Sequence, residues 1–392
     1  MSKIGVLTFH NNENRGAILQ AYSLCEVLDE VFSADVEVIE YRTKAKEHSR
    51  RNPIFLTKRP WRSVVRFKDR RIVEEFIDTK LPTSSESIIT DNHGRAVDWL
   101  ENQGYDMVIT GSDEIWKINT DLGGDFLPRL SPTRPFPNLY FLDPDLSSIK
   151  VAYAASANQT NPSDLSESKL SQVKTHLYSY DHVSVRDNHT EELVTKLGIS
   201  SVYRVPDPTL MTELPTSNVR DIFEENGINL DDPILGVHSH NDNPTFKEIC
   251  SYYRDKGFQI VTPTSSKFVD LELIGKVDPF EYYSTYEHYD MVITSSLHST
   301  IFSLKHGTPF TTVDVSSIYD NMESKTHSLL EEFSLLNRHI NAVNGDLSEF
   351  YARVDDLERK PDETHINRRV SGLREQGFDF LNMVKEDYET ND

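Results

Sequence analysis

The sequence is poor in several features that would define broad classes of protein. Its 392 residues include only two cysteines, Cys25 and Cys250, which excludes a disulfide framework and multi-cysteine metal motifs. Both cysteines lie in segments with a helical pattern, so we expect buried, unreactive thiols. No window approaches the roughly 18 to 20 uninterrupted apolar residues of a membrane-spanning helix. The first ten residues also lack the apolar region of a signal peptide, so we expect a cytoplasmic protein.

Basic residues are in the minority. Lysine and arginine total 41 against 63 aspartates and glutamates, which gives a formal net charge of −22. Such a charge argues against nucleic acid as a partner, because a phosphate backbone requires a basic face. It fits either a very soluble mesophilic enzyme or one adapted to high salt.

The segment 42–71 is a local exception, since it is rich in lysine and arginine and has very few acidic residues. A solvated helical hairpin is the simpler interpretation. The alternative is a patch that binds an anionic acceptor or makes weak contact with an anionic membrane surface, which would place the protein at the inner membrane face.

Short apolar runs alternate with helical patterns of about 10 to 15 residues along most of the chain. The first series of runs lies at 3–10, 36–41, 106–113, 150–156, 182–187 and 201–208, and the second at 233–240, 258–263, 290–298 and 309–315. This alternation predicts an α/β fold with two Rossmann-like, doubly wound domains that face a common cleft.

The two series of strands suggest a division of the chain into three parts. We predict a first domain at 1–214, a second at 215–345 and a helical segment at 346–392, with a hinge at 212–231. A helix over 366–388 is expected to pack back on the first domain.

The carboxyl ends of both sheets should meet at the cleft, so polar residues directly after the strands are the candidates for function. Asn12 and Arg15 belong to a polar turn that precedes a helix, a typical site for an anion or a sugar. Ser112, Asp113 and Glu114 follow the next run, where carboxylates can accept protons from hydroxyl groups. The alternative for Ser112 or Asp113 is a helix cap.

Two further strand ends carry charged residues. Arg186 precedes a helix, and its guanidinium suits a phosphate or carboxylate partner, although an ion pair with Asp181 or Asp187 is the structural alternative. Asp207 is followed by Pro208 and is either a turn residue or part of the site.

The segment 293–310 contains the strongest candidate for a catalytic residue. Ser296 ends a strand, and His298 lies in the first turn of the helix that follows. A histidine there can donate a proton near neutral pH, although a helix N-terminus disfavours its cation unless an anion is bound. A capping or core histidine is the alternative.

His238 and His240 are two residues apart on one face of a predicted strand, as in a metal pair. Because no matched third ligand can be named, we predict neither a metal nor a cofactor.

As an ordered set, these motifs resemble the polysaccharide pyruvyl transferase family over about residues 3–340. The matching segments are NRGAILQAYSL (14–24), DMVITGSDEIW (106–116), VAYAASA (151–157), VSVRDNHTEELVTKLGI (183–199), VPDPTL (205–210), ITSSLHSTIFSLKHGTPF (293–310) and KTHSLLEEFSLLNR (325–338). The family's fold is similar to that of GT-B glycosyltransferases. The resemblance implies transfer of pyruvate from phosphoenolpyruvate to two hydroxyls of a glycan sugar, as a ketal, with no further cofactor.

The resemblance also implies roles for individual residues. His298 would protonate the methylene carbon of the donor, Arg186 and Lys325 would hold its anionic groups, and Asp113 and Glu114 would orient or deprotonate the acceptor. The first domain would hold the acceptor, either nucleotide- or lipid-linked, and the second domain the donor.

The chain departs from better-known members at Ser296, where they carry an arginine. Either Arg15 or Lys305 compensates for the missing cation, or the substrate differs. Two other hypotheses therefore stay open, a GT-B glycosyltransferase that uses a nucleotide sugar and a non-catalytic glycan-binding protein.

Overall fold

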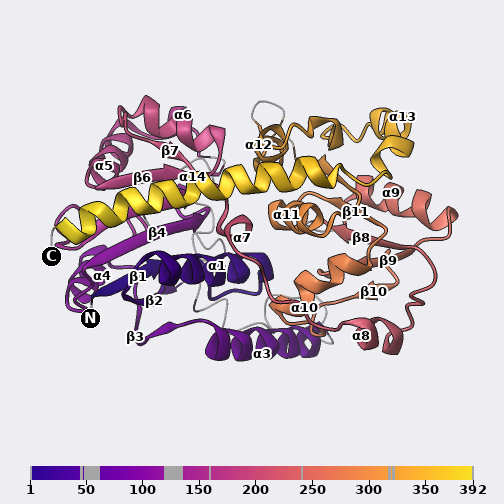
Figure 1. Cartoon of the computed structure of the whole chain (residues 1–392), viewed down its shortest axis with the longest axis horizontal. Helices are drawn as coiled ribbons and strands as arrows, with labels where there is room; N and C mark the ends of the chain where they lie inside the picture. The colour runs from indigo at the N-terminus through magenta and orange to yellow at the C-terminus, as the bar shows by residue number, and fades with distance from the viewer. Residues whose placement is uncertain are drawn as a thin grey trace, which may run out of the picture.

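A computed structural model describes residues 2–44, 47, 62–118, 136–158, 160–239, 242–316, 319 and 323–390. The chain forms two lobes, each built on a parallel sheet with helices on its faces (Figure 1). The first sheet has seven strands and the second has six. These sheets confirm the predicted α/β fold.

The first sheet has the strand order β3-β2-β1-β4-β5-β6-β7, with every neighbouring pair parallel. Its strands are β1 Lys3–Leu7, β2 Asp35–Arg42, β3 Thr83–Ile89, β4 Met107–Asp113, β5 Ile149–Ala155, β6 His182–Val185 and β7 Tyr203–Arg204. The central strands are buried because helices cover both faces, which explains their continuous apolar runs. The order reverses between β1 and β4, where a doubly wound sheet places its ligand site.

The second sheet has the strand order β10-β9-β8-β11-β12-β13, and its neighbouring strands are also parallel. Its strands are β8 Ile234–His238, β9 Gln259–Thr262, β10 Leu271–Glu272, β11 Met291–Thr294, β12 Phe310–Asp314 and β13 His339–Asn341. The order reverses between β8 and β11, directly before His298.

Helices connect the strands and cover both sheets. They are α1 Arg15–Val31, α3 Arg62–Lys80, α4 His93–Glu101, α5 Glu167–Tyr178, α6 Asn188–Lys196, α7 Pro208–Met211, α8 Arg220–Glu225, α9 Pro244–Asp255, α10 Pro279–Ser284, α11 Leu297–His306, α12 Lys325–Glu332, α13 Ser348–Leu357 and α14 Glu363–Thr390. Cys25 in α1 and Cys250 in α9 are buried and free, as expected. Within the described ranges, no helix has the length and apolar character needed to cross a membrane.

Helix α1 joins the two lobes through an apolar core. It packs on its own sheet and also contacts α10 and α11 of the second lobe. Tyr22 of α1 and Phe76 of α3 both pack edge-on against Phe280 of α10, with ring centroids 5.1 and 4.7 Å apart. Because one hydrophobic cluster spans both lobes, the relative position of their sheets is held by packing rather than by a loose linker.

The segment predicted as a hinge contains α8 and is part of that packing. Val219 and Phe223 are fully buried in the shared cluster. Much of the basic segment 42–71 lies outside the described residues. Within the described part, Arg42 forms ion pairs with Glu40 and Glu47.

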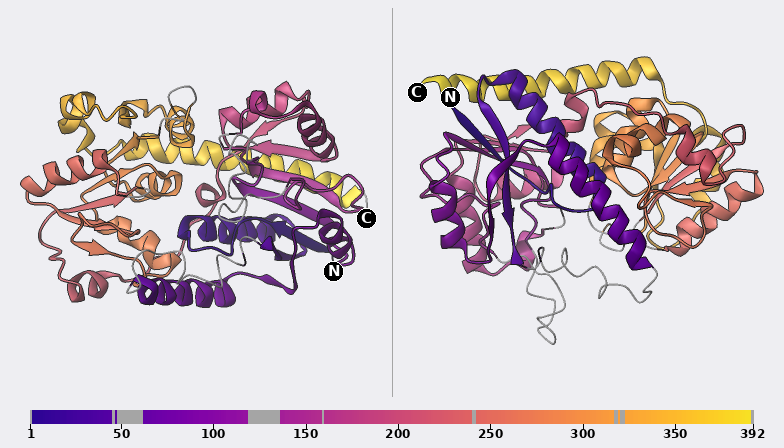
Figure 2. Two further views of the ribbon diagram at one scale, coloured as in Figure 1. Left: turned by 180° about the vertical axis from the view of Figure 1, so that it is seen from behind. Right: turned by 90° about the horizontal axis from the view of Figure 1, so that it is seen from below.

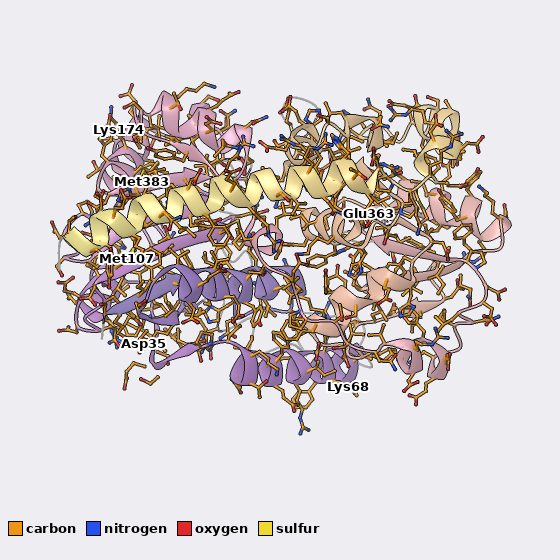
Figure 3. The ribbon with its side chains drawn as sticks, in the orientation of Figure 1. Asp35, Lys68, Met107, Lys174, Glu363 and Met383 are labelled. Atoms are coloured by element: carbon orange, nitrogen blue, oxygen red, sulfur yellow. The ribbon has the colours of Figure 1, made fainter. Side chains whose placement is uncertain are left out.

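The predicted C-terminal helix is α14, which extends beyond both predicted ends. It runs along both lobes, with Glu363 near one end and Met383 near the other (Figures 1, 2 and 3). Arg374 donates to the carbonyl of Met211, and Lys385 donates to the carbonyl of Val31. The helix therefore fastens α7 and the end of α1 to the rest of the fold.

Replacing Phe380 with alanine should destabilise the protein by about 3 to 5 kcal/mol, because this buried α14 ring fills space beside Tyr153 and Tyr203. Chemical denaturation followed by circular dichroism measures the change. Exposed Asn382 on the same helix provides the control, since Asn382→Ala should change the stability by less than about 0.5 kcal/mol. Equal effects of the two substitutions would contradict the packing described for α14.

Candidate active site

A cleft of about 810 Å³ lies between the lobes, and both sheets contribute to its walls. Seven of the residues predicted from the sequence line it: Asn12, Arg15, Asp113, Glu114, Ser296, His298 and Lys325. Arg186 and Asp207 lie behind His298, in a narrow cavity of about 30 Å³ that Lys325 also lines. Ser112 is buried and lines neither cavity.

His298 is held against the N-terminus of α1. A Cβ atom added to Gly16 would lie 2.5 Å from both Cγ and Nδ1 of the imidazole, so only glycine allows this close approach. The side chain of His298 is 9% exposed, and its Nε2 has no hydrogen-bond partner among the described residues. A buried polar atom without a hydrogen-bond partner is uncommon in folded proteins, and the residue that carries it also lines the cleft.

Asp207 is the carboxylate nearest to His298. Its Oδ2 lies 3.7 Å from Nε2 of His298 and accepts hydrogen bonds from Arg186 at 2.7 Å and Gln20 at 2.6 Å. Asp207 is the N-cap of α7, and its Oδ1 accepts hydrogen bonds from the amide and hydroxyl of Thr209. Asp207 is therefore both the turn residue and a charged member of the site, so the two interpretations are compatible.

Arg186 is buried, and its ion pair is with Asp207 rather than with Asp181 or Asp187. Its Nε and Nη2 atoms have no hydrogen-bond partner within the described part of the chain. Burial disfavours the charged guanidinium, but the carboxylates of Asp207, Asp113 and Asp187 outweigh this and raise its pKa. Arg186 therefore brings a fixed positive charge to the floor of the site.

Burial lowers the pKa of His298 below its ordinary value. The carboxylate of Asp207 favours the imidazolium and so raises the pKa of His298, whereas the positive charge of Arg186 lowers it further. For Asp207 itself, burial raises the pKa, but His298 and Arg186 outweigh burial and the pKa is lowered. At neutral pH the site thus holds an ionised aspartate beside a neutral imidazole, which an arriving anion would help to protonate.

An ion pair crosses the cleft from one lobe to the other. The ammonium of Lys325, at the start of α12, donates to Glu114 at 2.5 Å. Burial raises the pKa of Glu114, but Lys325 and Lys117 outweigh it and lower the pKa to about 2. Glu114 is consequently a weak base, suited to positioning rather than to accepting a proton.

Asp113 lies at the end of β4 with φ of 78°, a left-handed conformation that aspartate tolerates better than most residues. Its backbone carbonyl accepts from Ser156, which ties the strand end to the end of β5. Asp113 lines the cleft and acts electrostatically on His298, Arg186 and Lys325.

The N-terminus of α11 opens into the cleft. Ser296 occupies the N-cap position but makes no side-chain hydrogen bond to the helix amides. The first amides of an α-helix have no partner within the helix, and they favour anions. The site therefore combines a helix N-terminus with the imidazole of His298.

Better-known family members carry an arginine at the position of Ser296, and Arg15 and Lys305 are the residues predicted to compensate for it. The guanidinium of Arg15 donates to Asp69 and to the carbonyl of Val277, which joins α1 to the second lobe. Lys305 donates to the carbonyls of Thr209 and Thr212, and burial lowers its pKa to about 8. Both cations are engaged in holding the fold.

The sequence did not indicate Gly16 and Gln20 individually, although both belong to the motif 14–24. Their roles depend on α1 crossing to the second lobe, which a linear pattern does not reveal. His238 also lines the cleft, and its Nδ1 lies 3.1 Å from the hydroxyl of Tyr282. His240, its predicted neighbour in a metal pair, lies outside the described residues.

A family model for polysaccharide pyruvyl transferases matches residues 14–317. The chain belongs to this family. The match confirms the resemblance carried by the sequence motifs, and a search of curated proteins returned no match.

Solved structures show the same two-lobed fold. UDP-N-acetylglucosamine 2-epimerase of Rickettsia bellii aligns with a TM-score of 0.56 at 8% identity, covering 100% of this chain and 97% of that one. The Neisseria meningitidis UDP-GlcNAc 2-epimerase bound to UDP-GlcNAc aligns with a TM-score of 0.55 at 8% identity, covering 98% and 100%. A putative epimerase of Listeria monocytogenes aligns with a TM-score of 0.50 at 12% identity, covering 94% of each chain. At these identities the likeness concerns the fold alone.

The pKa of His298 should lie below 6.5 in the free protein, and Asp207→Asn should lower it further because a favourable negative charge is lost. Histidine-detected NMR titration measures both values, with His298→Gln identifying the signal. An unchanged or raised pKa in Asp207→Asn would contradict the arrangement.

The same pKa shift predicts how stability depends on pH. Below about pH 6.5 the unfolded chain binds a proton at His298 that the folded protein resists, so this residue makes stability fall as the pH falls. His298→Gln should therefore lose less stability than the parent protein between pH 7.5 and 5.5, as measured by denaturant titration. An identical or steeper loss in His298→Gln would contradict a lowered pKa.

Proposed function

We propose that this chain transfers the pyruvyl group of phosphoenolpyruvate to two hydroxyls of a glycan sugar as a ketal, and that it releases phosphate. The observation that carries the proposal is the buried imidazole of His298, whose Nε2 lies 3.7 Å from Oδ2 of Asp207 and has no hydrogen-bond partner among the described residues. Membership of the pyruvyl transferase family supports the same reaction.

His298 is the proposed acid. Its imidazolium donates a proton to the methylene carbon of the donor, and positive charge develops at the carbon that bears the phosphate. Asp207 lies close enough to stabilise the imidazolium before transfer. A trianionic donor adds negative charge nearby, so it raises the pKa of His298 when it binds and makes the acid available near neutral pH.

The remaining steps balance without a further reactant. An acceptor hydroxyl adds to the electron-poor carbon and loses its proton to a base. The carbon–oxygen bond to phosphate then breaks, phosphate leaves with the bonding electrons, and a second hydroxyl closes the ketal as it loses its proton. Of the two hydroxyl protons, one restores His298 and the other leaves with phosphate.

The anionic groups of the donor need partners that can form strong hydrogen bonds. The uncapped N-terminus of α11 and the ammonium of Lys325 both border the cleft beside His298. We propose that these groups bind the donor and take the place of the arginine that other family members carry at position 296. Arg186 lies beside Asp207 in the narrow cavity behind His298. It positions the carboxylate of Asp207 through a hydrogen bond and contributes a fixed positive charge.

The acceptor is assigned to the wall of the first lobe. Asp113 is the proposed base, because Glu114 is held ionised by Lys325 at a pKa of about 2. Glu114 and Asn12 then orient sugar hydroxyls. A cleft of about 810 Å³ is within the range of sites that take drug-sized ligands, so it leaves room for a sugar beside the donor. Whether that sugar is nucleotide- or lipid-linked decides whether the enzyme acts at the inner membrane face.

The first test is release of inorganic phosphate from phosphoenolpyruvate across a panel of sugar, nucleotide-sugar and lipid-linked acceptors. His298→Gln should lower the rate at least about 100-fold, since general acid catalysis commonly contributes that much. The melting temperature of His298→Gln, measured in parallel, shows whether the fold is kept.

The panel also separates the competing functions. Transfer from a nucleotide sugar with no use of phosphoenolpyruvate would favour a GT-B glycosyltransferase. Full activity in His298→Gln would contradict the assignment of His298 as the acid. Glycan binding without turnover of either donor would favour a non-catalytic protein.

Gly16→Ala should reduce turnover about 100-fold, because the added Cβ displaces the imidazole of His298. The same overlap with a buried side chain should lower the stability by about 1 to 3 kcal/mol. Gly372→Ala in α14 is the matched control, because its Cβ would meet nothing within 4 Å. Steady-state kinetics and melting temperatures of both variants test this. Parent-like turnover in Gly16→Ala would show that the contact does not position His298.

Lys325→Met should raise KM for phosphoenolpyruvate at least about tenfold, because a part-exposed cation that lines the cleft is lost. Lys117→Met is the control on the opposite wall of the cleft, since Lys117 is 33% exposed and lies 3.8 Å from Glu114. Similar KM values for the two variants would argue against a donor contact by Lys325.

A further inference from the structure

Two histidines and an aspartate meet on the first lobe, outside the cleft. His93 begins α4, His176 lies in the last turn of α5, and Asp143 lies in the segment between β4 and β5. Each residue offers a ligand atom, and these atoms lie within 4.8 Å of one another. We propose that His93, Asp143 and His176 bind one divalent transition-metal ion of the zinc class.

The ring of His176 is oriented as a ligand would be. Its Nδ1 lies 2.9 Å from the carbonyl oxygen of Leu142, which can only accept, so Nδ1 carries the proton. Nε2 therefore keeps its lone pair for a metal. Metal-binding histidines usually donate their other nitrogen to such an acceptor. Leu142 directly precedes Asp143, so one short stretch of chain both orients the imidazole and supplies the carboxylate.

The other two ligands are already in contact. Nε2 of His93 lies 2.8 Å from Oδ2 of Asp143, and Oδ1 of Asp143 accepts from the amide of Asp145 at 3.0 Å. In the described part of the chain, the only ion pair of Asp143 is with His93, so no lysine or arginine competes for the carboxylate. The rings of His93 and His176 are 5.5 Å apart and nearly perpendicular.

The donor set favours a particular kind of ion. Two imidazoles and one carboxylate suit Zn²⁺, which prefers nitrogen and oxygen or sulfur ligands in tetrahedral geometry. His93 and Asp143 are 17% and 19% exposed, which leaves access for water as a fourth ligand. A bound ion would replace the contact between His93 and Asp143 and would tie α4 and α5 to the segment before β5.

The three residues are far apart in the sequence and form no recognisable metal-binding spacing. The first lobe also contains a histidine–carboxylate pair that can be compared with the proposed metal site. His182 pairs with Asp387 at 3.1 Å, but no third ligand joins them among the described residues. His182→Gln is therefore a matched control for a histidine–carboxylate pair without a metal site.

The test is a titration of metal-free protein with Co²⁺, which replaces Zn²⁺ and absorbs visible light when bound by nitrogen and oxygen ligands. We expect one Co²⁺ per chain, displaced by Zn²⁺. His93→Gln and His176→Gln should weaken binding at least tenfold, whereas His182→Gln should leave it unchanged. Saturating Zn²⁺ should raise the melting temperature of the parent protein but not that of His93→Gln.

Absence of a Co²⁺ spectrum, or equal spectra in the parent protein and both ligand variants, would overturn the proposal. Circular dichroism checks that the variants fold. If the buried His176→Gln fails to fold, the part-exposed His93→Gln and Asp143→Asn decide the outcome. The measurement needs no substrate, so its result is independent of the proposed pyruvyl transfer.

Discussion

The carboxylate of Asp207 connects the parts of the candidate active site that come from different regions of the chain. Its Oδ2 accepts from Gln20 of α1 and from Arg186 after β6, and it lies 3.7 Å from His298 of the second lobe. Removing one partner of a buried ion pair costs about 3 to 5 kcal/mol, because the other charge is left uncompensated. The position of Asp207 is therefore a requirement for the fold as well as for the electrostatics of the site.

The resulting electrostatic balance suits a donor with several negative charges. Burial keeps the imidazole of His298 neutral in the free protein, and Asp207 limits how far its pKa falls. Lys325 is neutralised by Glu114 on the opposite wall. An entering anion can compete for Lys325 and raise the pKa of His298 in the same step. On this account, the acid becomes active when the donor binds.

Much of the fold was predictable because buried parallel strands are apolar along their length. The prediction failed for β3, whose sequence TSSESII is largely polar, and for the short strands β10 and β13. The position of His298 at the cleft was predictable because this residue follows a strand end. The contact with Gly16, the use of Arg15 to hold the lobes together and the position of Arg186 behind the cleft were not. Each depends on how segments far apart in the sequence pack together, which local patterns do not contain.

The central claim is that His298 delivers a proton to the methylene carbon of phosphoenolpyruvate. The most direct measurement is to run the reaction in D₂O, with an acceptor that supports phosphate release, and to examine the ketal methyl group by NMR. The account predicts one deuterium in each methyl group of the product, because the proton on His298 exchanges with solvent. A methyl group that contains no deuterium, or a product that contains no ketal, would contradict it.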